Sequence, residues 1–331
     1  MFRVLLIAAT LCLAAPATAQ DKAGAILTAW QNWTETSAIP NSAIAIGHNG
    51  DIVLLGSKGR DPRAPYPLAS LSKAITAVCL THVMNEHDLS LNTPIGDLAA
   101  IFARANVIIP PEAATITVAS LMTHTSGLAP DVTQGTFLFN RNKARTNNDK
   151  IARNALAPNG RRGTFGDYAY NNGNYAILGS LLEGLTGTDN VTACRDRLFP
   201  AGNRDTAGFN DEWISFAAMG GWEASTADYL AFVMKNFGPT STIARNPFET
   251  PHHPVADGIY YGTGTVFRHA EGQSTIWHSG AICNFGFFDQ GSYFVQYANG
   301  YAVMVTYDKC GSGKRWRPLD DALFNAAHND E

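Results

Sequence analysis

The order of strand-like and helix-like segments along this chain limits its fold more than any other feature. Segments rich in β-branched and aromatic residues lie near both ends, whereas the middle carries helical periodicity interrupted by Pro and Gly. Strands at both ends with helices between them predict an α+β fold, an antiparallel sheet flanked by helices with an inserted helical lobe. We expect the α+β lobe to comprise about residues 20–69 and 210–331, and the helical lobe about residues 70–209.

Individual segments follow from periodicity and turn residues. The first two predicted strands, 43–46 and 52–55, flank the turn sequence His48-Asn49-Gly50-Asp51. Helices are predicted over residues 70–85, 176–185, 226–236 and 320–327. The remaining predicted strands cover residues 262–268, 274–278, 284–289, 293–298 and 302–307.

Residues 1–19 have the composition of a removable export signal. A basic start at Met1-Phe2-Arg3 precedes an apolar run, and the small-residue sequence Ala17-Thr18-Ala19 follows it. The apolar run is too short to span a bilayer, and no second run of spanning length follows. We therefore expect a single domain over residues 20–331 that starts at Gln20, has no stable membrane span and is periplasmic or secreted.

Charge and histidine patterns narrow the possible partners. The net charge is −4 with no basic stripe, which argues against nucleic acid as a partner. Nine histidines are present, but none lies in a His-Glu-x-x-His or His-x-His-x-Asp motif, so we expect neither a metal nor another cofactor. A small molecule or a peptide is the expected substrate.

Four cysteines remain after the export signal, an even number that suits an oxidising compartment. Cys283 and Cys310 both belong to the strand-rich C-terminal region, and we expect a disulfide bond between them. Cys79 lies on the apolar face of the predicted helix over residues 70–85 and is expected to be a buried packing residue. Cys79 and Cys194 are therefore predicted to remain thiols.

The sequence Ser70-Leu71-Ser72-Lys73 begins the predicted helix over residues 70–85. Residues three apart share a helix face, so the Ser70 hydroxyl and the Lys73 amine would lie side by side. Such a pair can activate serine as a nucleophile, provided that burial or a cationic neighbour lowers the pKa of the lysine. The N–H groups at the helix start would also face the reacting atoms.

Two later motifs could complete such a site. In Tyr170-Asn171-Asn172, Tyr170 could share proton transfer with Lys73, and Asn172 could orient the lysine and a substrate amide or carbonyl. His278-Ser279-Gly280 is predicted to end a strand, where Gly280 would let substrate backbone approach. The backbone N–H of Ala281 would then be a second donor to the oxyanion.

These motifs resemble those of the serine β-lactamase and penicillin-binding protein superfamily, in particular the branch of class C β-lactamases, D-alanyl-D-alanine carboxypeptidases and related esterases. Three further segments are similar to that family's motifs: Leu121-Met122-Thr123-His124-Thr125-Ser126-Gly127-Leu128, the ten residues from Tyr170 to Gly179, and Gly220-Gly221-Trp222 followed by Ser225-Thr226-Ala227-Asp228. The resemblance implies a two-lobed β-lactamase/transpeptidase-like fold. It also implies Ser70 as nucleophile, Lys73 and Tyr170 as acid/base pair, and Asn172 as positioning group.

The chain also departs from the class C pattern. His278 stands where a class C β-lactamase is expected to have Lys, which resembles carboxypeptidases and D-amino-acid peptidases or esterases. Ala281 offers no hydroxyl to a substrate carboxylate. Arg268 could supply a positive charge, although a surface position is favoured for it. His124 is expected to hold the Thr-His-Thr-Ser-Gly turn rather than to act as a base.

The resemblance and these departures together predict an exported serine hydrolase that forms an acyl-enzyme on Ser70. Its expected substrates are small amides or esters, such as D-alanyl peptides or short-chain esters. Substrate contacts are expected from Asn172, His278, Ser279, Gly280 and Ala281. Two alternatives remain open at this point: a true class C-type β-lactamase, and a catalytically silent, penicillin-binding-like binding protein.

Overall fold

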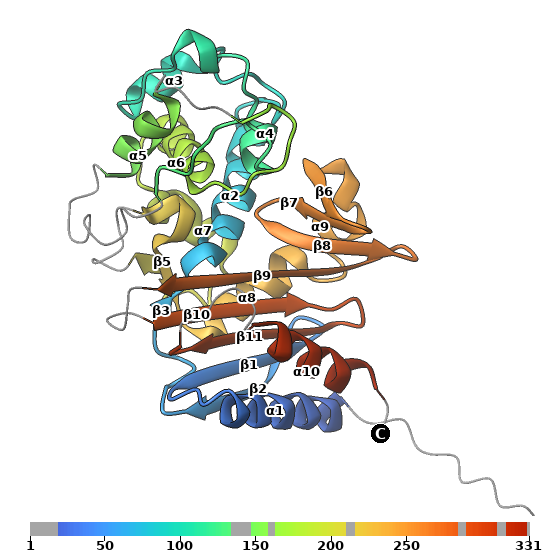
Figure 1. Ribbon diagram of the computed structural model, residues 1–331. Coiled ribbons are helices and arrows are strands. Elements are labelled where there is room, and N and C mark those ends of the chain that lie inside the picture. The colour runs from blue at the N-terminus through green and yellow to red at the C-terminus, as the bar shows by residue number, and fades with distance from the viewer. Residues whose placement is uncertain are drawn as a thin grey trace, which may run out of the picture.

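The computed structural model describes residues 19–133, 147–157, 163–209, 216–283, 289–309 and 316–329. In this part of the chain, a large antiparallel sheet lies next to a group of helices (Figure 1). The helices between residues 72 and 198 form the group beside the sheet, and strands from both ends of the chain form the sheet itself. The α+β class and the inserted helical lobe predicted from the sequence are confirmed.

The main sheet has eight strands in the order β2-β1-β11-β10-β9-β8-β7-β6. Strand β1 pairs with β11 over its full length, so the first hairpin and the last strands belong to one sheet. Strand β9 pairs with β8 through residues 273–277 and with β10 as far as Cys283, so its second half extends beyond β8. The strands are β1 (Ser42–His48), β2 (Asp51–Lys58), β6 (His252–Ala256), β7 (Ile259–Gly262), β8 (Thr265–Ala270), β9 (Gln273–Cys283), β10 (Asp289–Gln296) and β11 (Tyr301–Tyr307).

Helices cover both faces of this sheet. On one face α1 (Ala19–Thr36) and α10 (Trp316–His328) lie against each other and against the strands (Figure 1). Their apolar side chains, such as Trp30 and Leu323, form a buried cluster with Val303. On the other face α8 (Thr226–Phe237) packs on β1 and β11, and Leu230 is buried there in a second, larger cluster with Met304.

The helical lobe is built around α2, in which eleven of fifteen residues are buried. Its helices are α2 (Ser72–Glu86), α3 (Ala99–Arg104), α4 (Val118–Met122), α5 (Asn147–Leu156), α6 (Asn172–Thr186) and α7 (Asn190–Leu198). Helix α6 ends at Gly187, which has a φ of 68° and allows the left-handed cap. The short helix α9 (Thr242–Arg245) packs against β9, outside this lobe.

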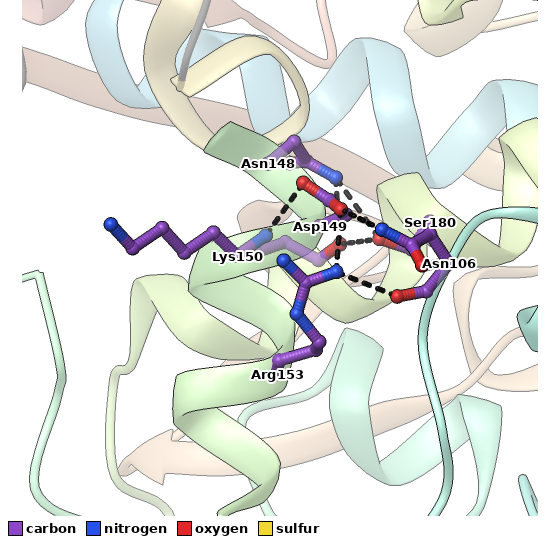
Figure 2. A network of polar contacts seen from close by, with 7 residues as sticks. Asn106, Asn148, Asp149, Lys150, Arg153 and Ser180 are labelled. Carbon is purple, nitrogen blue, oxygen red and sulfur yellow. Dashed lines mark hydrogen bonds and ion pairs between the residues drawn. The ribbon is translucent and has the colours of Figure 1, made fainter. Parts of the chain in front are cut away.

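Polar contacts fasten α5 to α6 (Figure 2). The Asn148 amide donates to the Ala176 carbonyl at 3.0 Å and to the Ser180 hydroxyl at 3.2 Å. Beside it, the Asp149 carboxylate accepts from Asn106 at 3.0 Å and from Arg153 at 2.6 Å. The Asn148 contacts hold the body of α6, whose first turn borders the candidate active site.

A small second sheet connects the lobes, in the order β3 (Tyr66–Pro67), β5 (Trp222–Ala224) and β4 (Gly208–Phe209). A single π-helical turn, Ala217–Gly221, leads into β5. It lies on the first turns of α2, where the Ala218 carbonyl accepts from Thr76 at 2.8 Å and the Ser72 hydroxyl accepts from the Trp222 N–H at 3.1 Å. The described residues also form the 3₁₀ helices Ala69–Leu71, Pro111–Ala113 and Pro247–Glu249.

Several elements differ from the prediction. The segment with His252 and His253, over which no strand is predicted, is the edge strand β6. Pro254 costs little there because one side of an edge strand needs no hydrogen-bond donor. No helix is predicted over α1, and α6 begins four residues before the predicted start, because Asn171 caps it by accepting from the Gly173 N–H. Most of the predicted strand over residues 284–289 lies outside the described residues.

The prediction that Cys79 and Cys194 are thiols is wrong. Both residues are fully buried, and a disulfide bond joins them across a sequence separation of 115 residues. The bond exists because α7 packs against α2, which places Cys194 next to Cys79. Cys283 is also disulfide-bonded, and Cys310, its predicted partner, lies outside the described residues.

Within the described ranges, no helix is long and apolar enough to cross a membrane. The predicted export signal lies outside these ranges except for Ala19, so it remains a prediction.

Candidate active site

Ser70 lies in a tight 3₁₀ turn, Ala69–Leu71, that runs directly into α2. Ala69 has a φ of 49°, a left-handed conformation that non-glycine residues rarely adopt. Such backbone strain is typical of functional sites, where the surrounding structure holds it in place. The sequence predicted Ser70 at the start of a helix. In the structure, Ser70 lies in the turn that immediately precedes α2.

Lys73 lies one turn after Ser70, and its Nζ atom is 3.2 Å from the Ser70 Oγ atom. The same Nζ donates a hydrogen bond to the Met219 carbonyl at 2.6 Å, which fixes the side chain from the other side. Lys73 is 0% exposed. Burial lowers its pKa from 10.5 to about 7, against the opposing effect of the Asp131 carboxylate. A large fraction of this lysine is thus neutral near pH 7.

Tyr170 reaches Ser70 from the segment before α6, and the two side chains share a hydrogen bond. Burial raises the pKa of Tyr170 well above its usual value of 10.0, and the hydrogen bond with Ser70 opposes this rise only in part. The phenol is therefore protonated at neutral pH and can donate a proton. The residue as a whole is 39% exposed, so Tyr170 lies at the mouth of the site with its hydroxyl turned toward Ser70.

The turn that contains His124 holds the Tyr170 segment. The His124 carbonyl accepts from the Ala169 N–H at 2.9 Å, and His124 Nδ1 accepts from the Asn171 N–H at 3.2 Å. The imidazole ring lies 4.4 Å from the ring of Tyr170, measured between centroids. The expectation that His124 is a hydrogen-bonding residue of the turn agrees with these contacts.

Asn172 is nearby but turned in a direction that the sequence did not suggest. Its side-chain amide donates to Asp131 Oδ2 at 3.2 Å and to Thr133 Oγ1 at 3.0 Å, and its backbone N–H also donates to Asp131. The NH₂ group of this amide is thus directed at the Asp131 loop, and the orientation of Lys73 by Asn172 stays a prediction. Its place in substrate binding stays a prediction.

The third motif lies in the middle of β9 rather than at its end, because the strand continues to Cys283. His278 is 6% exposed, and its Nδ1–H donates to the Ser279 carbonyl at 2.7 Å. Burial and the neighbouring Lys73 lower the pKa of His278 from 6.5 to about 3. The imidazole is therefore neutral at pH 7, without the fractional positive charge that a pKa of 6.5 would give it.

Gly280 permits a close approach of the protein's own backbone, and the approach of substrate backbone at this residue stays a prediction. A Cβ atom at this position would lie 2.9 Å from Ser70 N and 2.6 Å from the Leu68 carbonyl oxygen. Ala281, the next residue of β9, is exposed and pairs with Gly291 of β10.

A pocket of about 330 Å³ opens beside Ser70. It brings together four of the predicted site residues, Ser70, Tyr170, His278 and Ser279. The rest of its lining comes from residues that the sequence analysis did not select: Tyr168, Tyr261, Val266, Trp277 and Trp316. Among these residues, only Tyr168 and Trp277 could have been suspected from the sequence, because each lies one or two residues from a site motif. Trp316 comes from α10, and no sequence pattern places it there.

Arg268 does not line this pocket. It is exposed on β8, and its charge acts on the Asp320 carboxylate of α10. Among the residues that the structure describes, no group of three or more His, Cys, Asp or Glu side chains is placed to hold a metal ion.

Known proteins are similar to this chain in sequence and in fold. Residues 29–327 match the family described as Beta-lactamase. Penicillin-binding protein 4 of Amycolatopsis lactamdurans is 30% identical over 190 residues, which cover 54% of this chain and 47% of that protein. The chain thus spans less than half the length of this curated relative.

Solved structures share the fold at low sequence identity. The Beta-Lactamase/D-Alanine Carboxypeptidase from Pseudomonas syringae has a TM-score of 0.69 at 16% identity, with 94% of this chain and 99% of that chain covered. The D-amino acid amidase from Ochrobactrum anthropi has a TM-score of 0.68 at 15% identity, with 92% and 98% covered. Because the family match covers most of the sequence, this chain belongs to the beta-lactamase family.

Proposed function

We propose that this protein is a serine hydrolase that forms an acyl-enzyme on Ser70 and hydrolyses it. The observation that carries the proposal is the buried Lys73 amine, 3.2 Å from the Ser70 hydroxyl and with a pKa of about 7. A neutral amine at this distance can accept the hydroxyl proton as the oxygen attacks a carbonyl carbon.

The pKa values divide the proton transfers between two residues. Lys73 takes the proton of Ser70 as the new C–O bond forms. Tyr170, protonated at neutral pH, donates to the leaving oxygen or nitrogen as the tetrahedral intermediate collapses and the bond to the leaving group breaks. Tyr170 recovers a proton from Lys73, and water then attacks the acyl-enzyme with the same groups. The backbone N–H groups of Ser70 and Ala281 are the proposed donors to the oxyanion.

Neutral esters and amides fit the pocket better than substrates that present a carboxylate. No Arg or Lys lines the described pocket, His278 is neutral at working pH, and Ala281 has no hydroxyl. Lys73, at the bottom of the site, is largely neutral near pH 7, so a carboxylate would lose water and gain little positive charge in return, which is unfavourable. Short-chain esters and small neutral amides are favoured over penicillins and over peptides with a free C-terminal D-alanine. The similarity to a D-amino acid amidase supports the amide class.

We propose further that the protein is exported to the periplasm or secreted. The export signal predicted over residues 1–19 and the Cys79–Cys194 disulfide bond support this, because disulfide bonds persist mainly in oxidising compartments. N-terminal sequencing of the mature protein tests it: the proposal requires a start close to Gln20, and an intact Met1 in the native host contradicts it.

Acylation and turnover can be tested together. The protein is incubated with p-nitrophenyl acetate, with a fluorescent penicillin and with a chromogenic cephalosporin, and the labelled residue is found by mass spectrometry. We expect an acetyl adduct on Ser70, ester turnover that exceeds cephalosporin turnover, and a loss of roughly 10³-fold or more in Ser70→Ala.

Other outcomes separate the alternatives. Faster turnover of the cephalosporin than of the ester would identify a β-lactamase. Labelling of Ser70 by penicillin with no turnover of any substrate would identify a binding protein. Turnover that persists in Ser70→Ala would refute the proposed mechanism.

A further inference from the structure

Five of the nine described residues that line the 330 Å³ pocket beside Ser70 are tyrosine or tryptophan. Tyr168, Tyr170 and Tyr261 line it from one side, and Trp277 and Trp316 line it from β9 and α10. The rings of Tyr170 and Tyr261 are in a T-shaped arrangement, with centroids 6.2 Å apart and planes at 83°. Together they can offer a bound group both a ring face and a ring edge. Aromatic groups attract one another in such offset or edge-to-face arrangements.

The tryptophan wall is anchored on the sheet. Trp316 stacks on Tyr293 of β10, with centroids 5.8 Å apart and planes at 15°. Trp277 lies opposite Val266 in the β8–β9 ladder, and both residues line the pocket. The wall therefore belongs to the strands that carry His278 and Ser279 rather than to a separate loop.

We propose that this pocket binds an aromatic group of the substrate, so that the preferred substrates are neutral esters or amides that carry a phenyl-sized ring next to the scissile bond. This inference rests on the proposed function and names its substrate class. The pocket volume suits one ring and the scissile group, and the ring would exchange water contacts for contacts with the tyrosine and tryptophan side chains.

Aromatic cages also attract ammonium groups, but the surroundings of this pocket disfavour a second cation. No carboxylate belongs to the described lining. The Lys73 amine lies at the bottom of the site, 5.0 Å from the centroid of the Tyr170 ring, and its charge already disfavours protonation of His278. A neutral ring therefore fits this electrostatic environment better than an ammonium group.

The substrate test compares kcat/KM for ethyl acetate, benzyl acetate, ethyl phenylacetate and ethyl cyclohexylacetate. Benzyl acetate carries the ring on the leaving group and ethyl phenylacetate on the acyl group. We expect at least one of them to exceed ethyl acetate by about tenfold or more, because burial of a ring removes a large apolar area from water. We also expect ethyl phenylacetate or benzyl acetate to exceed the cyclohexyl ester by about threefold or more, from ring–ring contacts.

Two results overturn the proposal. One is a cyclohexyl ester that is used as well as both aromatic esters, which would mean selection for apolar bulk alone. The other is a preference for acetylcholine over benzyl acetate, which would mean that the rings bind a cation.

A binding measurement separates this proposal from the proposed function. Calorimetry on Ser70→Ala with phenylacetamide and with acetamide needs no acylation. Tighter binding of phenylacetamide supports the aromatic subsite even if wild type turns over no ester, and equal binding refutes the subsite even if Ser70 is acylated.

Matched variants on α10 test whether the aromatic ring of the substrate binds next to Trp316. Trp316→Ala should remove most of the preference for the aromatic substrate, and Trp316→Phe should keep most of it. Phe324→Ala is the control, because Phe324 is an exposed aromatic residue of the same helix that packs on Tyr297 and His328 outside the pocket. An unchanged preference in a folded Trp316→Ala protein, judged by its melting temperature, contradicts the assignment.

Discussion

Gly280 of β9 lies so close to Ser70 that a Cβ atom on Gly280 would be 2.9 Å from the Ser70 backbone nitrogen. The same atom would be 2.6 Å from the Leu68 carbonyl oxygen, which is also a backbone atom and cannot rotate away. Only glycine permits this approach. The contact sets the position of Ser70 relative to Ala281, the two proposed sources of oxyanion donors.

Gly280→Ala should therefore lower kcat/KM by about 10²-fold or more, since a shift of the nucleophile by about 1 Å has such effects. Ester hydrolysis at fixed pH measures the loss. Gly208→Ala in β4 is the control, because a Cβ atom there meets no heavy atom within 4 Å, and it should keep near-normal activity. A Gly280→Ala protein with wild-type kcat/KM would show that β9 and Ser70 do not depend on this contact.

The pKa of Lys73 predicts the pH dependence of the reaction. The free enzyme needs a neutral amine, so kcat/KM should rise with pH through about 7 and then level off. Lys73→Arg keeps the positive charge but cannot lose its proton, and should lose activity at every pH. A wild-type profile that is flat between pH 5 and 9 would exclude Lys73 as the base.

Lys73 also makes stability depend on pH. The pKa of Lys73 is about 7 in the folded chain, whereas an unperturbed lysine, as in the unfolded chain, has a pKa of 10.5. Between pH 7 and pH 10.5 the unfolded chain therefore binds more protons than the folded chain. Stability should therefore increase as pH rises through this range. Urea unfolding at pH 7 and pH 9 measures the gain. Lys73→Met should reduce it, and an equal gain in the variant would mean that other groups cause it.

His278 is expected to stay neutral through the whole working range. Its pKa of about 3 means that the folded chain binds fewer protons than the unfolded chain between pH 3 and pH 6.5. The contribution of His278 to stability is therefore lost as pH falls through this range. The imidazole resonances of His278 in an NMR titration should not move between pH 5 and 8. A midpoint near 6.5 would contradict the burial argument.

His278→Lys should favour substrates with a carboxylate. A lysine ammonium at the edge of the pocket would supply the cation that the described lining lacks. The ratio of kcat/KM for a penicillin to kcat/KM for a neutral ester should then rise. The rise should correspond to a free-energy difference of about 1–2 kcal/mol in favour of the penicillin. An unchanged ratio would mean that residue 278 does not meet the substrate carboxylate, provided that the variant remains folded.

The sequence predicted those parts of the site that depend on local geometry. Ser70 and Lys73 adjoin because three residues make about one helical turn, and the turn around Asn49 and Gly50 follows from their tolerance of positive φ. Contacts between distant segments were missed. The pairing of Cys79 with Cys194 depends on how α7 meets α2, and the direction of the Asn172 amide depends on where the loop with Asp131 folds back.

The pocket wall illustrates the same limit. Trp316 is separated from Ser70 by most of the chain and reaches the pocket only because α10 packs on the sheet next to Tyr293. Neither periodicity nor a motif records such a contact. Burial of His278 is likewise a property of the assembled fold, so its standard pKa gave the wrong charge.

The Cys79–Cys194 bond should contribute substantially to stability. It closes a loop of 115 residues and so restricts the unfolded chain, an effect of roughly 2–5 kcal/mol. Cys194→Ala should lower the urea midpoint, and non-reducing peptide mapping of wild type should recover the two cysteines in one linked peptide pair. Recovery of both as alkylated thiols would contradict the bond.

His124 provides the last prediction, because it holds the Tyr170 segment through both its carbonyl and its Nδ1 atom. Its φ of 60° is one that Asn tolerates, and an Asn oxygen can replace Nδ1 as acceptor for the Asn171 N–H. His124→Phe keeps a ring beside Tyr170 but leaves that buried N–H without its acceptor.

We expect His124→Phe to lower kcat by about 10–100-fold with little change in KM. Loss of one buried hydrogen bond costs about 1–3 kcal/mol, and here the loss displaces Tyr170, the proton donor, rather than a group that binds substrate. His124→Asn should retain most of kcat. Melting temperatures show whether both variants fold. If both variants fold and lose kcat equally, the ring of His124 positions Tyr170, and its acceptor nitrogen does not. If neither variant loses kcat, the hydroxyl of Tyr170 is positioned by Ser70 and Lys73 alone.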